Sequence, residues 1–325
     1  MTLLCFPRAG FTQTLHDAER WSTKGSRNVA EFVYIVGMAE AGDGGIQVSD
    51  GRLNMLIGLS ASGVPLRIAA RRGNGPGEVR GPTLLTGTPS GGLAVYDIGQ
   101  NAIQIWNRDM QFEQWVRLEA MVVNPKGFVV LPTGHFVLSG GISRNPSAIH
   151  RFHSDGRLDA SWYTAPRTED PRVGLMIAGG PLAVTADGRL LFSLAAPHRI
   201  LAYPVRGGEA KLIAGDPKLL AAIADDFMRE EGRGSTRRAT FQWHFPQSRA
   251  VLPPSERRIL NVVLYMERGT SLWEVYSPDG KLLSRKEVSR AYHPWAITSN
   301  GDVLASYRDP DTDEHIAVRL ALSLR

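Results

Sequence analysis

The 325-residue sequence predicts an all-β fold, a six-bladed β-propeller with four-stranded blades. The first observation behind this prediction is a tight turn that recurs about every 45 residues, the spacing of propeller repeats. The second is a further turn inside each of the first five units, which divides the unit into two hairpins. The third is the content of 34 Gly and 20 Pro, which suits a chain built from hairpin turns. The first turns of the six units are Gly44-Gly45, Ser90-Gly91, Thr133-Gly134, Asp187-Gly188, Ser255-Glu256 and Asn300-Gly301.

Short apolar runs between these turns supply the expected strands. In the third unit, residues 128–131 and 135–139 flank the first turn, and residues 148–152 form the third strand. In the fourth unit, residues 182–184 and 190–193 flank the corresponding turn. Continuous apolar runs are typical of strands buried on both faces, here between neighbouring blades. Further strands are expected at residues 92–97, 102–106, 199–203, 259–265, 271–276, 295–297, 303–307 and 315–320.

The last unit contains three expected strands before the chain reaches Arg325. A blade that lacks its outer strand would expose an unpaired sheet edge, which native proteins avoid. We therefore expect residues 9–30, within an N-terminal closing segment of residues 1–33, to supply that strand. The whole chain, residues 1–325, is then a single propeller domain.

Two long connections, residues 164–177 and 216–248, break the period. The second has a helical pattern in its first half, because Asp216 is a suitable N-cap, Pro217 stands where proline is favoured, and Gly232 provides a stop. Both connections run from an outer strand to the next inner strand, so they are expected on one face. Loops of this length are often functional. The apolar residues at helical spacing in the second are Leu219, Leu220, Ile223 and Phe227.

The composition excludes several classes of protein. Hydrophobic residues make up 43% and charged residues 21%, which argues against disorder. The one cysteine, Cys5, allows neither an intramolecular disulfide nor a multi-Cys metal site. No run reaches the ~18 apolar residues of a transmembrane helix. The net charge of +5 is spread along the chain, so a nucleic acid is not expected as a partner, and we expect a monomer.

One segment carries a family resemblance. Residues 71–79 read Arg-Arg-Gly-Asn-Gly-Pro-Gly-Glu-Val and resemble the G-x-G-x-G-P-G-E-F linker between blades of NHL-repeat and related bacterial six-bladed β-propellers. Residues 92–97 and 101–106 are similar to that family's second and third strands, whereas Val79 stands where Phe is usual. Its glycines allow a tight crossing at positive φ, and Glu78 can accept hydrogen bonds from exposed backbone amides.

The resemblance implies a propeller without implying one chemistry. Related propellers include RNA- and protein-binding modules, lactonases with an axial metal and lyases with axial histidines. Many are exported, so the resemblance implies a periplasmic or extracellular location. Residues 1–7 are apolar but too short for a signal peptide, so this location would require a truncated N-terminal signal. A cytoplasmic location is the alternative.

Candidate site residues gather on the face that carries both long connections, where propeller sites usually open. Two blade entrances, Trp243-His244 and His293-Pro294-Trp295, each place a His beside a Trp just before an inner strand. Two histidines and a carboxylate could hold a metal or serve as acid and base, so His244 and His293 are the candidate catalytic and metal-binding residues. A His at a strand entrance more often packs locally with a satisfied imidazole. The binding residues expected on this face are Arg80, Asp97, Arg144, Arg172, His198, Arg199, Trp243, Glu267, Arg268 and Trp295.

These observations favour a non-catalytic propeller that binds a protein, peptide, glycan or small molecule through its central-channel face. No catalytic motif is complete: neither G-x-S-x-G nor H-E-x-x-H occurs, and residues 309–314 lack the Gly that a calcium loop needs at its sixth position. No cofactor is predicted. The alternative is a metal-dependent lyase or lactonase-type enzyme, in which His244, His293 and a carboxylate such as Asp97 or Glu267 hold a divalent metal.

Overall fold

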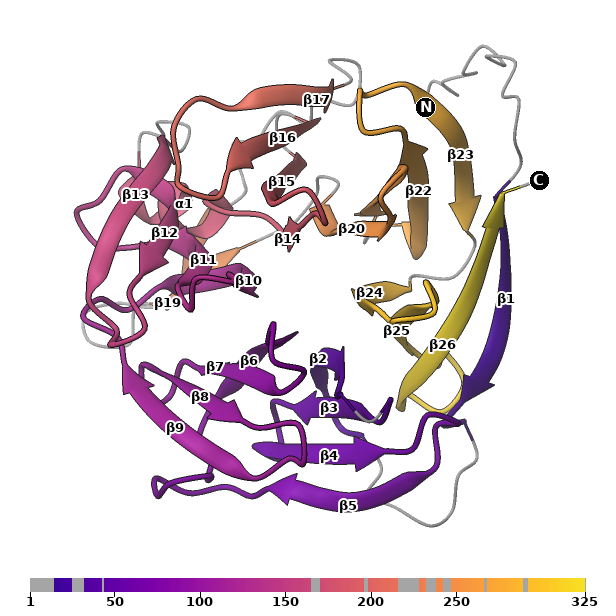
Figure 1. Cartoon of the computed structure of the whole chain (residues 1–325), viewed down its shortest axis with the longest axis horizontal. Coiled ribbons are helices and arrows are strands. Elements are labelled where there is room, and N and C mark those ends of the chain that lie inside the picture. Colours follow the sequence, from indigo (N-terminus) through magenta and orange to yellow (C-terminus); the bar gives the residue numbers. More distant parts are fainter. Residues whose placement is uncertain are drawn as a thin grey trace.

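Six four-stranded antiparallel sheets stand around a common axis in the described part of the chain (Figure 1). The computed structural model describes residues 15–24, 32–42, 44–164, 170–195, 198–215, 228–231, 238–241, 247–265, 268–288 and 292–324. In every blade the strand nearest the axis pairs with the next strand toward the rim. The predicted six-bladed propeller with four-stranded blades is confirmed.

The blades follow one another along the chain. The first two consist of β2 (Ile35–Glu40), β3 (Ile46–Asp50), β4 (Met55–Leu59) and β5 (Pro65–Ala70), then β6 (Pro82–Gly87), β7 (Leu93–Asp97), β8 (Ala102–Trp106) and β9 (Phe112–Arg117). The third and fourth consist of β10 (Val123–Val130), β11 (Phe136–Gly141), β12 (Ser147–Phe152) and β13 (Leu158–Thr164), then β14 (Leu182–Val184), β15 (Arg189–Ala195), β16 (His198–Pro204) and β17 (Lys211–Gly215). The last two contain β20 (Gln247–Ser255), β21 (Arg258–Tyr265), β22 (Thr270–Tyr276) and β23 (Leu282–Val288), then β24 (His293–Ile297), β25 (Val303–Arg308) and β26 (His315–Leu324).

The ring is closed by its two ends. β1 (Leu15–Ser22) pairs antiparallel with β26, and Leu15 lies opposite Leu324. The sheet order β1-β26-β25-β24 makes β1 the outer strand of the sixth blade (Figure 1). The prediction that a strand within residues 9–30 completes the last blade is therefore confirmed, and the edge that an incomplete blade would expose is paired.

The core lies between neighbouring blades, as the continuous apolar runs predicted. Every residue of β3 and of β7 is buried. Leu56 of β4 packs in one cluster with Leu93 of the next blade, and Leu260 of β21 packs with Val303 of β25. The outer strands are more exposed: Leu66 of β5 keeps 66% of its surface accessible. Burial on both faces explains why the middle strands show no polar alternation.

The linker at residues 71–79 has the predicted geometry. The backbone N–H of Gly75 donates to Glu78 Oε2 at 2.8 Å, and Gly77 has a φ of +75°. A Cβ on Gly73 would lie 2.0 Å from the same Glu78 oxygen, so a larger residue there would displace this carboxylate. Glu78 thus holds the crossing from the rim to the axis.

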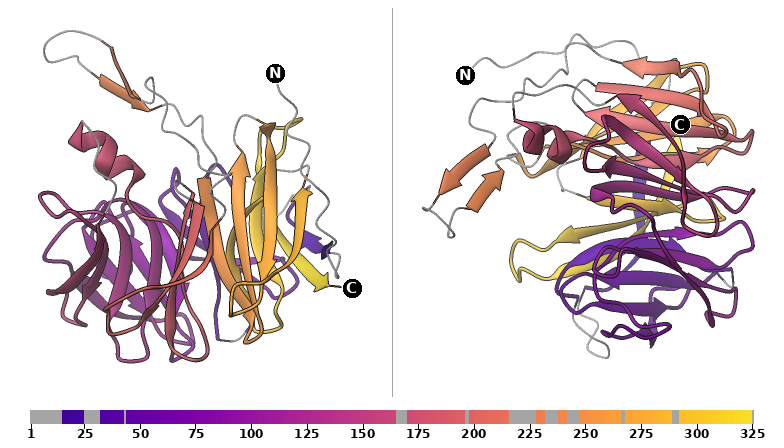
Figure 2. Two further views of the ribbon diagram at one scale, coloured as in Figure 1. Left: turned by 90° about the horizontal axis from the view of Figure 1, so that it is seen from above. Right: turned by 90° about the vertical axis from the view of Figure 1, so that its left-hand side faces the viewer.

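Both long connections project from the same side of the ring (Figure 2). The first contains α1 (Pro171–Ile177), whose N-cap Asp170 accepts from Arg172 N at 2.8 Å. The second contains the hairpin of β18 (Met228–Glu231) and β19 (Arg238–Phe241). Residues 216–227, the main part of the predicted helix, lie outside the described residues. Its expected end at Gly232 is wrong, because residues 228–231 pair as strand β18. Within the described residues, no helix combines the length and apolarity needed to cross a membrane.

Candidate functional site

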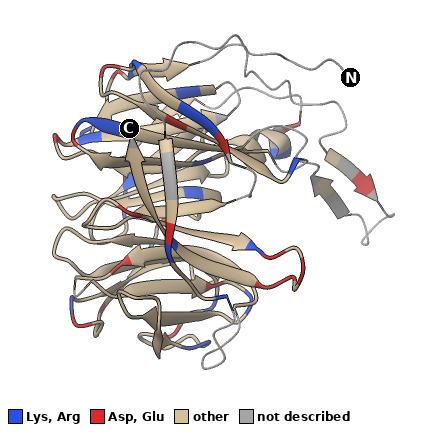
Figure 3. Ribbon diagram, turned by 90° about the vertical axis from the view of Figure 1, so that its right-hand side faces the viewer, with Lys and Arg blue, Asp and Glu red and all other residues tan. Residues whose placement is uncertain are grey.

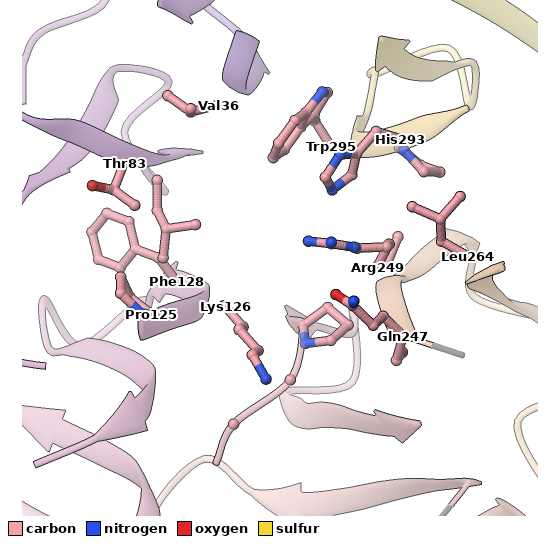
Figure 4. A pocket seen from close by; sticks show the side chains of 18 of the residues that line it. Val36, Thr83, Pro125, Lys126, Phe128, Gln247, Arg249, Leu264, His293 and Trp295 are labelled. Carbon is pink, nitrogen blue, oxygen red and sulfur yellow. The ribbon is translucent and has the colours of Figure 1, made fainter. Parts of the chain in front are cut away.

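A cavity of about 620 Å³ lies on the propeller axis (Figure 4). Its wall is made by the six inner strands β2, β6, β10, β14, β20 and β24, together with Met176 and Ile177 at the end of α1. A volume of this size is typical of sites for small molecules and cofactors. The cavity thus meets the face from which both long connections project.

β-bulges aim side chains into this cavity. Five of the six inner strands lose register with their partner near the axis, and the residues that these shifts skip line the cavity. Near the axis the shift skips one residue in β2, β6, β20 and β24, and three residues, 124–126, in β10. A residue left unpaired by a bulge can turn its side chain out of the pleat. The skipped residues labelled around the cavity are Val36, Thr83, Pro125, Lys126, Arg249 and Trp295 (Figure 4).

Two of these residues are cations. Lys126 Nζ donates to the Met176 carbonyl oxygen at 3.1 Å. Burial, together with the charge of Arg249, lowers the pKa of Lys126 to about 7. Burial also lowers the pKa of Arg249, and its Nε is buried without a hydrogen-bond partner among the described residues. The described lining contains no Asp or Glu, so none of the described side chains around the cavity supplies a carboxylate to these two residues.

A flat aromatic surface forms another part of the wall. The rings of His293 and Trp295 stack with centroids 4.1 Å apart and an interplanar angle of 20°. Trp295 Nε1 donates to Ser306 Oγ at 2.9 Å, which fixes the indole. Burial, then the charges of Arg249 and His315, hold the pKa of His293 well below its ordinary value. His293 is therefore neutral at pH 7, and the positive charge belongs to the lysine and the arginine.

His198 lies elsewhere, in a buried network between blades 4 and 5. Its Nε2 is 3.1 Å from Glu274 Oε2, and Asn261 Nδ2 donates to the same oxygen at 3.0 Å. Arg285 Nη2 is 2.6 Å from the other Glu274 oxygen. Burial by itself raises the pKa of Glu274, but the hydrogen bond and charge of His198, with the charge of Arg285, hold it below its ordinary value. This geometry makes His198 part of the interblade packing.

Asp97 is fully buried at the end of β7, where backbone amides occupy its carboxylate. It accepts from Arg80 N at 2.7 Å and from Gln100 N at 3.2 Å. Asp50 holds the same place in the first blade and accepts from Val33 N at 2.7 Å and Leu53 N at 2.9 Å. A carboxylate at this position accepts hydrogen bonds both from the segment that precedes the inner strand of the blade and from the loop that follows the second strand.

The remaining predicted site residues are scattered. Arg80, Arg144, Arg199 and Arg268 are exposed and do not line the cavity. Arg172 is exposed on α1, where its Nη1 lies 2.5 Å from Glu230 Oε1 of β18. Trp243, His244 and Glu267 lie outside the described residues, so the proposed pairing of His244 with His293 is not tested. Of the described set, the structure brings His293 and Trp295 together in the cavity.

The sequence analysis missed Lys126 and Arg249, although a signal for both is present. The axial residue is followed by Gly or Ala in four inner strands, as in Lys126-Gly127 and Arg249-Ala250. Trp295-Ala296, which was selected, and Val36-Gly37 share this pattern. The inner strand crowds its neighbour here: a Cβ on Gly127 would lie 2.6 Å from Leu182 N. Aligning the blade entrances by this small residue would have found all four positions.

Charge on the outer surface is mixed. In the side view of Figure 3, Lys and Arg alternate with Asp and Glu along the described ribbon, without a stripe of either sign. A basic stripe is the usual footprint of a nucleic-acid site. Among the described residues, no group of three or more His, Cys, Asp or Glu is placed to hold a metal ion. The concentrated charge of interest is therefore the cation pair in the cavity.

Comparison with known proteins shows the fold. No protein-family model matches the chain, and no curated protein matches it in sequence. A streptogramin B lyase structure is similar with a TM-score of 0.56 and 14% identity, covering 96% of this chain and 99% of that one. A gluconolactonase from Xanthomonas campestris has a TM-score of 0.57 and 13% identity over 90% and 87% of the two chains. An inferred exported protein from Bacteroides fragilis has a TM-score of 0.60 and 11% identity over 96% and 95%. The structural similarity establishes the propeller fold, but at identities this low it does not indicate an activity.

Proposed function

We propose that this propeller is a non-catalytic binding protein whose axial cavity takes a small anionic molecule, a carboxylate or a phosphate. The observation that carries the proposal is Arg249, a half-buried arginine whose Nε is buried and has no hydrogen-bond partner among the described residues. A buried N–H donor without a partner costs about 1–3 kcal/mol. A bound anion would offset that cost, since arginine binds carboxylates and phosphates through paired N–H donors.

The rest of the wall supports a ligand with an apolar or planar body. The His293–Trp295 stack offers a flat face, and Phe128 and Leu264 add apolar surface (Figure 4). Sites of this kind combine a largely apolar lining with a few placed polar groups. Met176 at the end of α1 lines the cavity, so the first long connection forms part of its wall. We infer a ligand with one anionic end and an apolar remainder.

The metal-dependent lyase or lactonase-type alternative has less support. It requires His244 beside His293 and a carboxylate near both. Of these residues, His293 is the one that lines the described part of the cavity. Asp97 does not line it, and its carboxylate accepts hydrogen bonds from backbone amides. Two cations in the cavity would also repel a divalent metal.

Four further expectations belong to this proposal. They are kinship with NHL-repeat propellers, a bacterial source, a periplasmic or extracellular location and a monomeric state. The linker geometry around Glu78 supports the first, since its glycines and carboxylate are used as in the resembled motif. Size-exclusion chromatography with light scattering tests the monomer.

Calorimetric titration of the full-length protein tests anion binding. In a Hepes buffer, inorganic phosphate, acetate and benzoate are the probes, and their order of affinity distinguishes phosphate from carboxylate ligands. We expect Arg249→Gln to weaken the best probe by about tenfold or more, the usual value of a charged hydrogen bond. Arg157→Gln, on an exposed turn, is the matched control. Equal affinity in wild type and Arg249→Gln, or no binding of any probe, overturns the proposal.

A further inference from the structure

We propose that Lys126 forms a reversible imine with a carbonyl group of the bound anion, so that the cavity captures small oxo acids. The inference rests on the proposed function, because it uses Arg249 as the partner of the acid group. It adds a substrate class, an aldehyde or ketone that also carries a carboxylate. It also assigns a covalent site to Lys126.

The geometry places an amine and a guanidinium on opposite walls of one cavity. Lys126 projects from β10 and Arg249 from β20, and both side chains point into the space between them (Figure 4). The Met176 carbonyl oxygen, 3.1 Å from Nζ, holds the amine at the end of α1. Arg249 can bind the carboxylate of a small acid while the amine meets its carbonyl carbon. This two-point arrangement favours a carbonyl group near the acid end of the ligand.

Imine formation needs the neutral amine, and this cavity supplies it. An ordinary lysine has a pKa near 10.4, so fewer than about one in a thousand are neutral at pH 7. With a pKa of about 7, Lys126 is neutral in about half of the molecules at that pH. A desolvated lysine beside a second cation is a recognised way of activating this nucleophile.

The step balances without an oxidant or a reductant. The Nζ lone pair attacks the carbonyl carbon, and the C=O π electrons move to oxygen to give a carbinolamine. One amine proton moves to that oxygen, which becomes the hydroxyl group of the neutral carbinolamine. The carbinolamine then loses this hydroxyl group and its remaining N–H proton as water, and a C=N bond joins ligand and lysine. Hydrolysis reverses the sequence, so the capture is reversible.

The described groups that face the cavity are compatible with a lowered Lys126 pKa. No Asp or Glu is among the described lining residues, so none of them stabilises the ammonium ion. Burial and neighbouring charges also keep His293 and His315 below their ordinary pKa values, so both are neutral at pH 7. The titratable or charged groups that line the cavity with Lys126 are Arg249 on β20, His293 on β24, Arg308 on β25, His315 on β26, and Tyr34 and Tyr307.

Reductive trapping tests the inference on the full-length protein. The protein is incubated with glyoxylate or pyruvate and sodium cyanoborohydride, and labelled lysines are located by peptide mass mapping. We expect labelling of Lys126 at least tenfold above that of exposed lysines such as Lys211. Lys126→Arg should lose this label while keeping the charge, and Lys211→Arg should not change it. The rate at Lys126 should rise with pH through about 7 and then level off, whereas exposed lysines keep gaining reactivity toward pH 10.

Two further probes separate this inference from anion binding. Arg249→Gln should lower trapping of glyoxylate more than trapping of propanal, which has no acid group, because both reactions lose the charge that lowers the Lys126 pKa and only glyoxylate also loses the partner of its carboxylate. Lactate, a hydroxy acid without a carbonyl, should bind wild type and Lys126→Arg with similar affinity. If lactate binds but Lys126 is labelled no faster than Lys211, the imine is excluded and the proposed function stands. If no acid binds, both are overturned.

Discussion

Trp21 of β1 lies directly against Gly63 in the turn between β4 and β5, so that a Cβ on Gly63 would be 2.5 Å from the indole ring. The Trp21 Nε1 donates to the Ala61 carbonyl oxygen at 3.0 Å. The same contact recurs elsewhere in the ring: a Cβ on Gly156 would meet the Arg117 carbonyl oxygen at 2.0 Å. The turn of each of these blades packs on the outer strand of the blade before it. Where the ring closes, between the last blade and the first, β1 is the outer strand of the last blade and the turn of the first blade packs on it.

Gly63→Ala should therefore destabilise the ring more than an alanine at a free turn. Both Gly63, with φ of +82°, and Gly134, with φ of +79°, pay the left-handed cost, about 1–2 kcal/mol. Nothing lies within 4 Å of a Cβ on Gly134, so only Gly63→Ala must also displace Trp21. Denaturant unfolding should give a free energy of unfolding about 1–3 kcal/mol lower for Gly63→Ala than for Gly134→Ala. Equal values would mean that the contact between β1 and this turn adjusts freely.

Deleting residues 1–24 should abolish cooperative folding. The deletion removes β1 and leaves β26 as an exposed edge ten residues long. We expect aggregation or a broad thermal transition in differential scanning calorimetry. Deleting residues 1–12, which leaves β1 intact, is the control and should melt like the full chain. A sharp transition at the wild-type temperature in the longer deletion would contradict the closure.

Glu274→Gln should be strongly destabilising at neutral pH. The variant removes the carboxylate that pairs with Arg285 and lies beside His198, and breaking such a buried ion pair typically costs about 3–5 kcal/mol. Because the pKa of Glu274 is lowered on folding, its stabilisation is present above its ordinary value near 4.3 and is lost as pH falls through the folded value. Denaturant unfolding should therefore show a smaller difference in the free energy of unfolding between Glu274→Gln and wild type at pH 3 than at pH 7. Glu287→Gln, at an exposed position on the same blade, should stay within about 1 kcal/mol at both.

Lys126→Met should be more stable than wild type at pH 7. The pKa of Lys126 falls to about 7 on folding, so between pH 7 and 10 the unfolded chain binds more protons there. Wild-type stability should consequently rise with pH across this window, and Lys126→Met should lack that rise. Denaturant unfolding at pH 7 and pH 9.5 measures it, and the advantage of the variant should shrink at the higher pH. Lys281→Met, at an exposed turn, should follow wild type. Parallel pH profiles for wild type and Lys126→Met would show that Lys126 is protonated at neutral pH.

The fold was predictable because its signals are local. A turn such as Thr133-Gly134 needs a residue at positive φ, and the runs beside it are apolar because both faces of the strand are buried. The need for an outer strand from the N-terminal segment was predictable because the last unit contains three expected strands where a blade needs four. The second long connection was not, because residues 228–231 take their backbone partners from β19 rather than from a helical turn.

The candidate site was only partly predictable. His293 and Trp295 stood out by residue type, and the structure places both in the axial cavity. His198 was also selected by residue type, but it lies beside Glu274 of the next blade and belongs to the packing between the two blades. Lys126 and Arg249 do not stand out by residue type, and the small residue that follows each of them marks the position only once the blade entrances are aligned. Whether such a residue is axial depends on which residue each β-bulge leaves unpaired.

The sequence by itself determined the number of blades, the turns between strands and the ring closure, because turn chemistry and burial patterns act over a few residues. Only the tertiary structure decided which side chains meet on the axis. Lys126 and Arg249 are far apart in the chain, and their encounter depends on bulges in β10 and β20 and on the way the blades pack around the ring. Desolvation then changes their chemistry, since burial lowers both pKa values and brings the amine of Lys126 toward its neutral form at pH 7.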